Sequence, residues 1–184
     1  KEGEPLRPAI TWLDQRNSEP LGNLPKLHEF MFRMAGAKDL VERYQQRAQY
    51  LWIASHQPDV WQRTHKYLNI SGFLNFRLCG DYVDSVASQV AYLPFDYKAL
   101  KWAPETDWRY KLLPGLSAEM FPKLYRPAAK MGEISSEASR LTGIPAGLPL
   151  MASASDKSCE ILGSGGHTAD VACMSYGTTA TINT

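Results

Sequence analysis

The segment "PLMASASDKSCEILGSGG", residues 149–166, constrains the fold most, because it predicts a strand that passes directly into a helix. Its apolar, proline-bounded start predicts a buried strand over 149–154, and the helix that follows begins near Asp156. Unpaired backbone N–H groups and the helix dipole stabilise a carboxylate in the first turn of a helix, so a capping role alone would account for Asp156. The small residues before it would also let a ligand approach closely, and Asp156 would then be a general base for a substrate hydroxyl.

Strand and helix patterns alternate along the chain, which predicts an α/β fold. The run "AITWLDQ" predicts a strand over 9–15, and apolar residues spaced by three and four predict helices over 26–35 and 39–55. The further predicted elements, in chain order, are a short helix from Pro58, a short strand at "KYLN", a helix through "GFLNFRL" that ends at Gly80, short helices near 108–113 and 117–121, a helix over 132–143 with Ser135 or Ser136 near its cap and Gly143 at its end, and two strands joined by a turn at Gly177.

The composition predicts a globular chain without a general affinity for polyanions. Of the 184 residues, 44% are hydrophobic, and 20 Lys and Arg nearly balance 19 Asp and Glu. No net field is therefore available for a nucleic acid or an anionic membrane, and no apolar run approaches the roughly 20 residues that span a bilayer. The N-terminal segment lacks the apolar stretch of an export signal, so we expect a cytoplasmic protein. The Cys and His residues have no paired spacing, which predicts reduced thiols and no metal site made by protein ligands alone.

The segment "SYGTTAT", residues 175–181, is a second candidate site. Gly177, Thr178 and Thr179 offer backbone N–H groups and hydroxyls that suit phosphate oxygens, although an ordinary hairpin turn has the same composition. The glycine-rich "LGSGG" at 162–166 follows its predicted helix instead of preceding one, so we interpret it as a helix end and not as a nucleotide loop.

The segment "TWLDQR" is the third candidate. Trp12 is suited either to the core or to stacking on the face of a sugar. Asp14 and Arg16 would either form an ion pair that fixes a loop or contact a substrate, and the sequence does not choose between these alternatives.

Four segments of the chain follow one another in a recognisable order. They are "PAITWLDQR", "YLWIASHQPDVWQRTHKYLNISGFLNFRLCGDYV", "GEISSEASRLTGIPAGLPLMASASDKSCEILGSGG" and "MSYGTTATI". In that order they resemble motifs of the FGGY carbohydrate kinases, a family that includes glycerol, xylulose and ribulose kinases. Because the resemblance runs over nearly the whole chain, it is more specific than any one of the motifs.

The resemblance implies an ATP-dependent phosphorylation of a sugar or polyol hydroxyl. Asp156 falls where the family has its catalytic aspartate, the base that takes the proton as the hydroxyl attacks the γ-phosphate of ATP in the presence of Mg²⁺. Phosphoryl transfer requires mainly positioning and charge neutralisation, which one carboxylate and a metal ion can provide. Gly177, Thr178 and Thr179 match the turn that embraces the ATP phosphates.

The resemblance also implies a sugar pocket and a fold. Trp12 matches a tryptophan at the polyol site, and Tyr44 matches a tyrosine that lines it. The implied fold is ribonuclease H-like, as in actin-like ATPases. Residues 1–168 would then be an N-terminal sugar-binding lobe without its first strands, and 169–184 the first hairpin of a C-terminal ATP-binding lobe. We therefore expect a fragment that is inactive alone, from an enzyme that forms a homodimer.

Lys157 departs from the family pattern, which often has Gln or Asn after the catalytic Asp. A lysine here would lower the pKa of the neighbouring carboxyl group, contact an acidic or phosphorylated substrate, or face solvent. The segment "ERYQQRAQ" also differs from the family's approach to its second helix. These departures support an alternative function, a non-catalytic actin-like or sugar-binding module.

Overall fold

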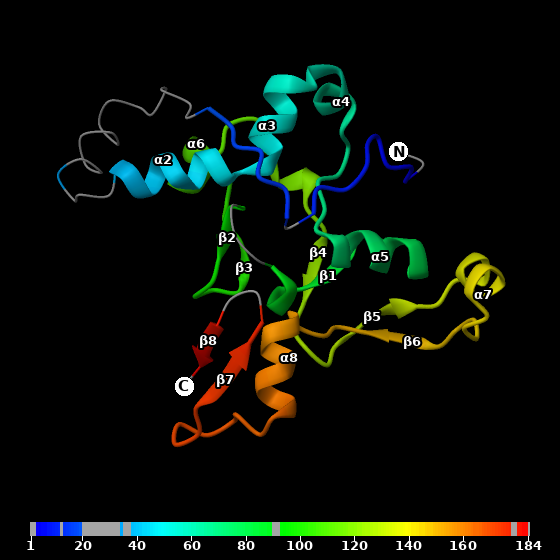
Figure 1. The fold of residues 1–184 in the computed structure, drawn as a ribbon. Helices are drawn as coiled ribbons and strands as arrows, with labels where there is room; N and C mark the ends of the chain where they lie inside the picture. Colours follow the sequence, from blue (N-terminus) through cyan, green and yellow to red (C-terminus); the bar gives the residue numbers. More distant parts are fainter. Residues whose placement is uncertain are drawn as a thin grey trace.

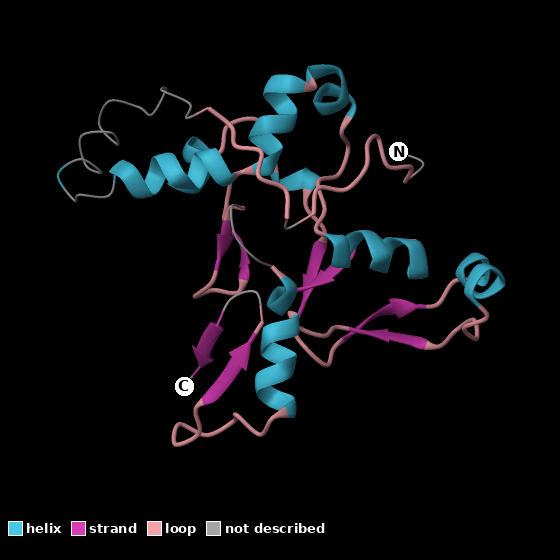
Figure 2. Ribbon diagram, viewed as in Figure 1, coloured by secondary structure: helices cyan, strands magenta, loops and turns pink. Residues whose placement is uncertain are grey.

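The computed structural model describes residues 3–11, 13–19, 34, 38–89, 93–177 and 180–183. Figures 1 and 2 show a mixed α/β chain in which the helices of residues 38–63 lie in the upper part, short strand pairs lie below them, and a later helix lies beside the C-terminal hairpin. The helices are α2 Lys38–Arg47, α3 Gln49–His56, α4 Pro58–Arg63, α5 Ile70–Cys79, α6 Trp108–Leu112, α7 Ser136–Thr142 and α8 Asp156–Gly163, with 3₁₀ helices η1 Val86–Ser88 and η2 Ala118–Met120. None of these helices is long and apolar enough to cross a membrane.

The strands form two-stranded pairs within the described part of the chain. β1 and β4 are parallel, with Val83 opposite Lys123, whereas the other three pairs are antiparallel. The bounds are β1 Val83–Ser85, β2 Phe95–Asp96, β3 Lys101–Trp102, β4 Lys123–Tyr125, β5 Lys130–Glu133, β6 Pro149–Met151, β7 Cys173–Tyr176 and β8 Ala180–Asn183. The parallel pair joins segments about forty residues apart, and it brings β1 to the centre of the molecule (Figure 1).

Capping residues confirm several predicted helices. α4 starts with Pro58, a favoured first helical residue, and α5 ends at Gly80, whose φ of 84° is left-handed. Ser135 accepts a hydrogen bond from the backbone N–H of Ala138 at the start of α7, and Gly143 ends that helix. The short helices expected near 108–113 and 117–121 are α6 and the 3₁₀ helix η2.

The helix predicted over 39–55 is divided into α2 and α3 at Ala48. Ser18 stabilises this break between the two helices. Its hydroxyl lies within hydrogen-bond distance, 3.2 to 3.3 Å, of the carbonyl oxygens of Gln45, Gln46 and Ala48. The Ser18 backbone N–H also donates to the Gln46 carbonyl at 2.9 Å. These contacts replace helical partners that the broken turn lacks. The helix predicted over 26–35 lies outside the described residues except for Met34, which is helical.

Two predicted strands do not form among the residues that the structure describes. The described residues of 9–15 are not in a strand, and "KYLN" is extended without a ladder, with one backbone bond from Tyr67 to Met120 at 2.9 Å. A run of β-forming residues becomes a strand only when a partner strand lies beside it. The strand predicted over 149–154 is shorter, ending at Met151, and it is not buried, because Met151 is 48% exposed.

The main core lies among the helices of the upper part of Figure 1. Tyr50 and Leu113 are fully buried there, and the hydroxyl of Tyr50 donates to the Pro114 carbonyl at 3.3 Å. The buried members are Val41, Ala48, Tyr50, Leu51, Leu93, Ala103, Tyr110, Leu112, Leu113, Leu116, Met120 and Phe121. A second, smaller cluster of Val83, Met131 and Ala152 packs between β1 and the β5–β6 pair.

Candidate active site

Asp156 is the first residue of α8, but it does not cap the helix. Ser155 is the N-cap, and its hydroxyl accepts from the Ser158 backbone N–H. The alternative in which Asp156 serves as the cap is therefore wrong. One oxygen of Asp156 accepts from the Lys157 backbone N–H at 2.8 Å, and the other accepts no hydrogen bond from any described residue. The carboxylate is exposed, so it is available to a ligand at a helix start whose dipole favours negative charge.

The start of α8 lies beside η1, near the middle of the molecule (Figure 1). The backbone N–H of Ser155 donates to the Ala87 carbonyl of η1 at 3.0 Å. The Ser85 hydroxyl donates to the Ser153 carbonyl, two residues before the cap. Neither Ser85 nor Ala87 could be predicted from the sequence, because these contacts join segments almost seventy residues apart.

The side chain of Lys157 contacts other residues as well as solvent. Its ammonium group lies 2.8 Å from a Glu160 carboxylate oxygen and 3.1 Å from the Ser175 hydroxyl. The hydrogen bond to Glu160 raises the pKa of Lys157 above its usual value, and the charge of Asp156 acts in the same direction. Because Ser175 belongs to β7, its hydrogen bonds with Lys157 and Glu160 join the helix that carries Asp156 to the strand that precedes Gly177.

The β7–β8 hairpin forms as predicted, with Ser175 opposite Thr181. Gly177 is exposed after β7, and a Cβ added there would meet no atom within 4 Å. The space at this glycine would let a phosphate approach the backbone. Thr178 and Thr179, the other two residues of the predicted phosphate turn, lie outside the described residues.

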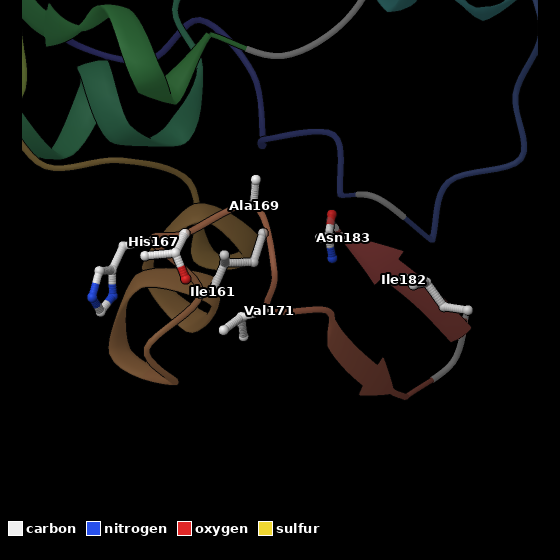
Figure 3. Close-up of a pocket in the computed structure, with 8 residues that line it drawn as sticks. Ile161, His167, Ala169, Val171, Ile182 and Asn183 are labelled. Carbon is white, nitrogen blue, oxygen red and sulfur yellow. The ribbon is translucent and has the colours of Figure 1, made fainter.

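A cavity of about 650 Å³ lies between α8 and this hairpin (Figure 3). Its walls combine apolar side chains, among them Ile161, Val171 and Ile182, with the polar side chains of His167 and Asn183. Asp156 does not line it. The cavity therefore belongs to the packing of the helix against the hairpin and not to the acidic site.

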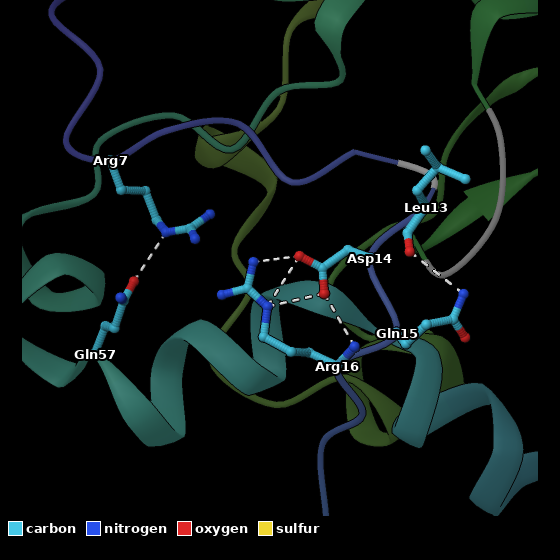
Figure 4. Close-up of polar contacts among 6 residues, drawn as sticks. All are labelled: Arg7, Leu13, Asp14, Gln15, Arg16 and Gln57. Atoms are coloured by element: carbon cyan, nitrogen blue, oxygen red, sulfur yellow. Dashed lines mark hydrogen bonds and ion pairs between the residues drawn. The ribbon is translucent and has the colours of Figure 1, made fainter.

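Asp14 and Arg16 form an ion pair (Figure 4). The Arg16 Nε lies 2.8 and 2.9 Å from the two Asp14 oxygens, and the Arg16 backbone N–H donates to Asp14 at 2.9 Å. These hydrogen bonds lower the pKa of Asp14 from 3.8 to about 2. The Arg16 guanidinium also lies 4.4 Å from the centre of the Trp52 ring. The pair thus fixes its own loop against α3, and a contact of either residue with substrate stays a prediction.

Tyr44 packs at the edge of the main core. Its hydroxyl donates to the Leu93 carbonyl at 3.1 Å, and the ring is half-buried. Trp12, predicted to share a sugar pocket with Tyr44, lies outside the described residues. The candidate site residues that the structure describes thus form two groups. One lies around α8 and β7, and the other lies around the loop at Asp14 and helices α2 and α3.

A model of the FGGY family of carbohydrate kinases, N-terminal domain, matches residues 1–163, and the chain belongs to this family. Its fold is the ribonuclease H-like fold of actin-like ATPases, as in the solved sugar kinases that it resembles. The glycerol kinase of Plasmodium falciparum, solved with ADP, aligns with a TM-score of 0.71 at 20% identity, covering 98% of this chain and 35% of that chain.

Two curated relatives come from Escherichia coli (strain K12). L-fuculokinase is 22% identical over 165 residues, which cover 90% of this chain and 34% of the relative. The uncharacterized sugar kinase YgcE is 28% identical over 177 residues, which cover 96% of this chain and 28% of the relative. The chain therefore spans about a third of the length of the curated relatives that it matches.

Proposed function

We propose that this chain carries the acceptor-binding part and the general base of an ATP-dependent carbohydrate kinase. Family membership supports the reaction class. The observation that carries the proposal is the exposure of the Asp156 carboxylate at the start of α8. One of its oxygens accepts no hydrogen bond from a described residue, and Ser155, not Asp156, caps the helix. The Asp156 carboxylate would accept the proton of a sugar or polyol hydroxyl as its oxygen attacks the γ-phosphate of ATP.

Magnesium and ATP belong to this proposal. No group of three or more His, Cys, Asp or Glu side chains in the described part of the chain is arranged to hold a metal ion. Mg²⁺ is commonly held by one or two carboxylates together with substrate phosphates and water, so an exposed Asp156 fits as one donor. When bound, Mg²⁺ would neutralise charge on the phosphates. Gly177, with Thr178 and Thr179, would hold those phosphates.

Lys157 would act on the site through structure. Its hydrogen bond to Ser175, together with that of Ser175 to Glu160, holds α8 against β7, so that Asp156 and Gly177 after β7 lie on elements that are joined to each other. This arrangement favours the kinase over the non-catalytic module. Lys157 at the position after Asp156 supported the module, and its contact with Ser175 gives that residue a structural role in a kinase as well. We further propose a homodimeric enzyme in the cytoplasm that acts on a small sugar or polyol, as expected from the sequence, with 1–168 and 169–184 belonging to its two lobes.

The test is Asp156→Asn in the full-length protein, with ADP release measured against a panel of ketoses and polyols. Loss of a general base predicts a fall in kcat of about 10²- to 10⁴-fold. Glu137→Gln is the matched control, because Glu137 is also an exposed acid in the first turn of a helix, α7. Near-parental turnover by Asp156→Asn would refute the assignment, and sugar binding without ADP release by the parent would favour the binding module.

A further inference from the structure

Asp84, at the centre of β1, is a buried carboxylate outside the candidate active site. It is 1% exposed and accepts four hydrogen bonds. The donors are the Ser71 hydroxyl at 2.8 Å, the Gln89 amide at 2.9 Å, the Ser85 backbone N–H at 2.8 Å and the Asn75 amide at 3.3 Å. No cation among the described residues forms an ion pair with it. Full satisfaction by four donors makes such a group a rigid point of the structure.

Helix α5 is adapted to this carboxylate. Ser71 and Asn75 are four residues apart, so they lie on the same face of the helix and both reach Asp84. Gly72 lies between them, and a Cβ built there would stand 3.3 Å from an Asp84 oxygen. Glycine is unfavourable within a helix, and here it permits the close approach of β1.

The end of β1 transmits this fixed position to α8. Ser85, whose N–H is held by Asp84, donates its hydroxyl to the Ser153 carbonyl. The same hydroxyl accepts from the Ala87 N–H at 3.2 Å, and the Ala87 carbonyl accepts from Ser155 at 3.0 Å. The segment 153–155 is therefore bound at both ends to Ser85 and Ala87, which lie shortly after Asp84 in the chain.

Packing does not fix the start of α8, because none of the eight residues of this helix is buried. The hydrogen bonds of Ser175 and of Cys173 with α8 join this helix to the β7–β8 hairpin and leave its place relative to β1 open. Backbone hydrogen bonds to Ala128 and Ala129 hold Ala152, and beyond that residue the hydrogen bonds of segment 153–155 with Ser85 and Ala87 fix the start of the helix. They therefore fix the place of Asp156.

We propose that Asp84 is a positioning residue for the phosphoryl-transfer site, acting through Ser85 and Ala87 on the start of α8. This inference rests on the proposed role of Asp156. A general base acts at hydrogen-bond distance, so a shift of about 1 Å lowers the rate about a hundredfold while leaving ligand binding nearly intact. Asp84 itself does not contact the substrate.

The test compares Ser85→Ala with Ser135→Ala in the full-length protein. Both serines cap a short helix after a strand and accept from a backbone N–H, but Ser85 alone of the two also donates to the segment before α8. Ser85→Ala should accelerate amide hydrogen exchange across 153–160 about tenfold or more and lower kcat about 10- to 100-fold, with KM for ATP within about twofold. Ser135→Ala should change neither quantity.

A purely structural role for Ser85 would reduce thermal stability without separating kcat from KM. Parental exchange over 153–160, or parental kcat with faster exchange, would overturn the positioning role. Asp84→Asn should show the same two effects more strongly, and if it does not fold, Ser85→Ala decides the question. Failure of the proposed function has a different signature, because Asp156→Asn would then turn over at the parental rate.

Discussion

Replacement of Gly72 by alanine tests the rigidity of the Asp84 network directly. Alanine is favoured over glycine in a helix by up to about 1 kcal/mol, so the substitution alone predicts a more stable protein. The new Cβ would stand 3.3 Å from Asp84 Oδ2 and 3.6 Å from the Leu68 side chain. Asp84 must then move by a few tenths of an ångström, although its four donors and its burial hold it in place.

The size of the effect follows from the hydrogen bonds that move. A hydrogen bond to a charged group contributes about 1.5–3 kcal/mol, and weakening the four bonds by the equivalent of one costs about 2 kcal/mol. Subtracting the propensity gain leaves Gly72→Ala less stable than the parent by about 1 kcal/mol. Gly163→Ala is the control, because Gly163 ends α8 and a Cβ there meets no atom within 4 Å. This variant should be as stable as the parent or more so.

Urea unfolding, monitored by circular dichroism, gives the free energy of unfolding of both variants from the transition midpoint. A double-mutant cycle with Asp84→Ala isolates the contact, because without the carboxylate Gly72→Ala should stabilise the protein. The expected coupling energy is about 2 kcal/mol. If Gly72→Ala stabilises the parent as much as Gly163→Ala does, Asp84 is not held rigidly and the reasoning is refuted.

Two further predictions concern the pH dependence of stability and the end of α5. Because the pKa of Asp14 is lowered to about 2 in the folded protein, its contribution is fully present above its unfolded pKa near 3.8 and is lost as the pH falls through about 2. Arg16→Gln should flatten the stability profile in that window, and an unchanged profile from urea titrations would contradict the role of the pair. Gly80→Ala should cost about 1 kcal/mol because φ is 84°, whereas Gly80→Asn should cost less; equal unfolding midpoints for the two variants would contradict this.

Features set by neighbouring residues could be predicted from the sequence. The ends of α5 at Gly80 and of α7 at Gly143 depend on a left-handed residue that glycine adopts readily, and both were placed correctly. The hairpin around Gly177 was also found. Pairings between distant segments were missed, because nothing local predicts that Val83 lies opposite Lys123.

The candidate site shows the same division. Asp156 was singled out correctly as the first carboxylate of a helix, but its neighbour Ser155 was not recognised as the cap. Asp84 was missed altogether. Its signal was present in "ISGFLN", where Ser71 and Asn75 interrupt an apolar helix at a spacing of four, opposite an aspartate in an apolar run. A polar pair on such a helix predicts a buried polar partner, although not which one.

The exposure of α8 has a practical consequence for following this site in solution. Cys159 is an exposed thiol one turn after Asp156, whereas Cys79 and Cys173 are half-buried. A thiol-directed fluorine tag or fluorophore should therefore attach to Cys159 first. The native sequence thus carries a spectroscopic reporter within one helical turn of the proposed base, and its signal should respond when a sugar or a nucleotide arrives.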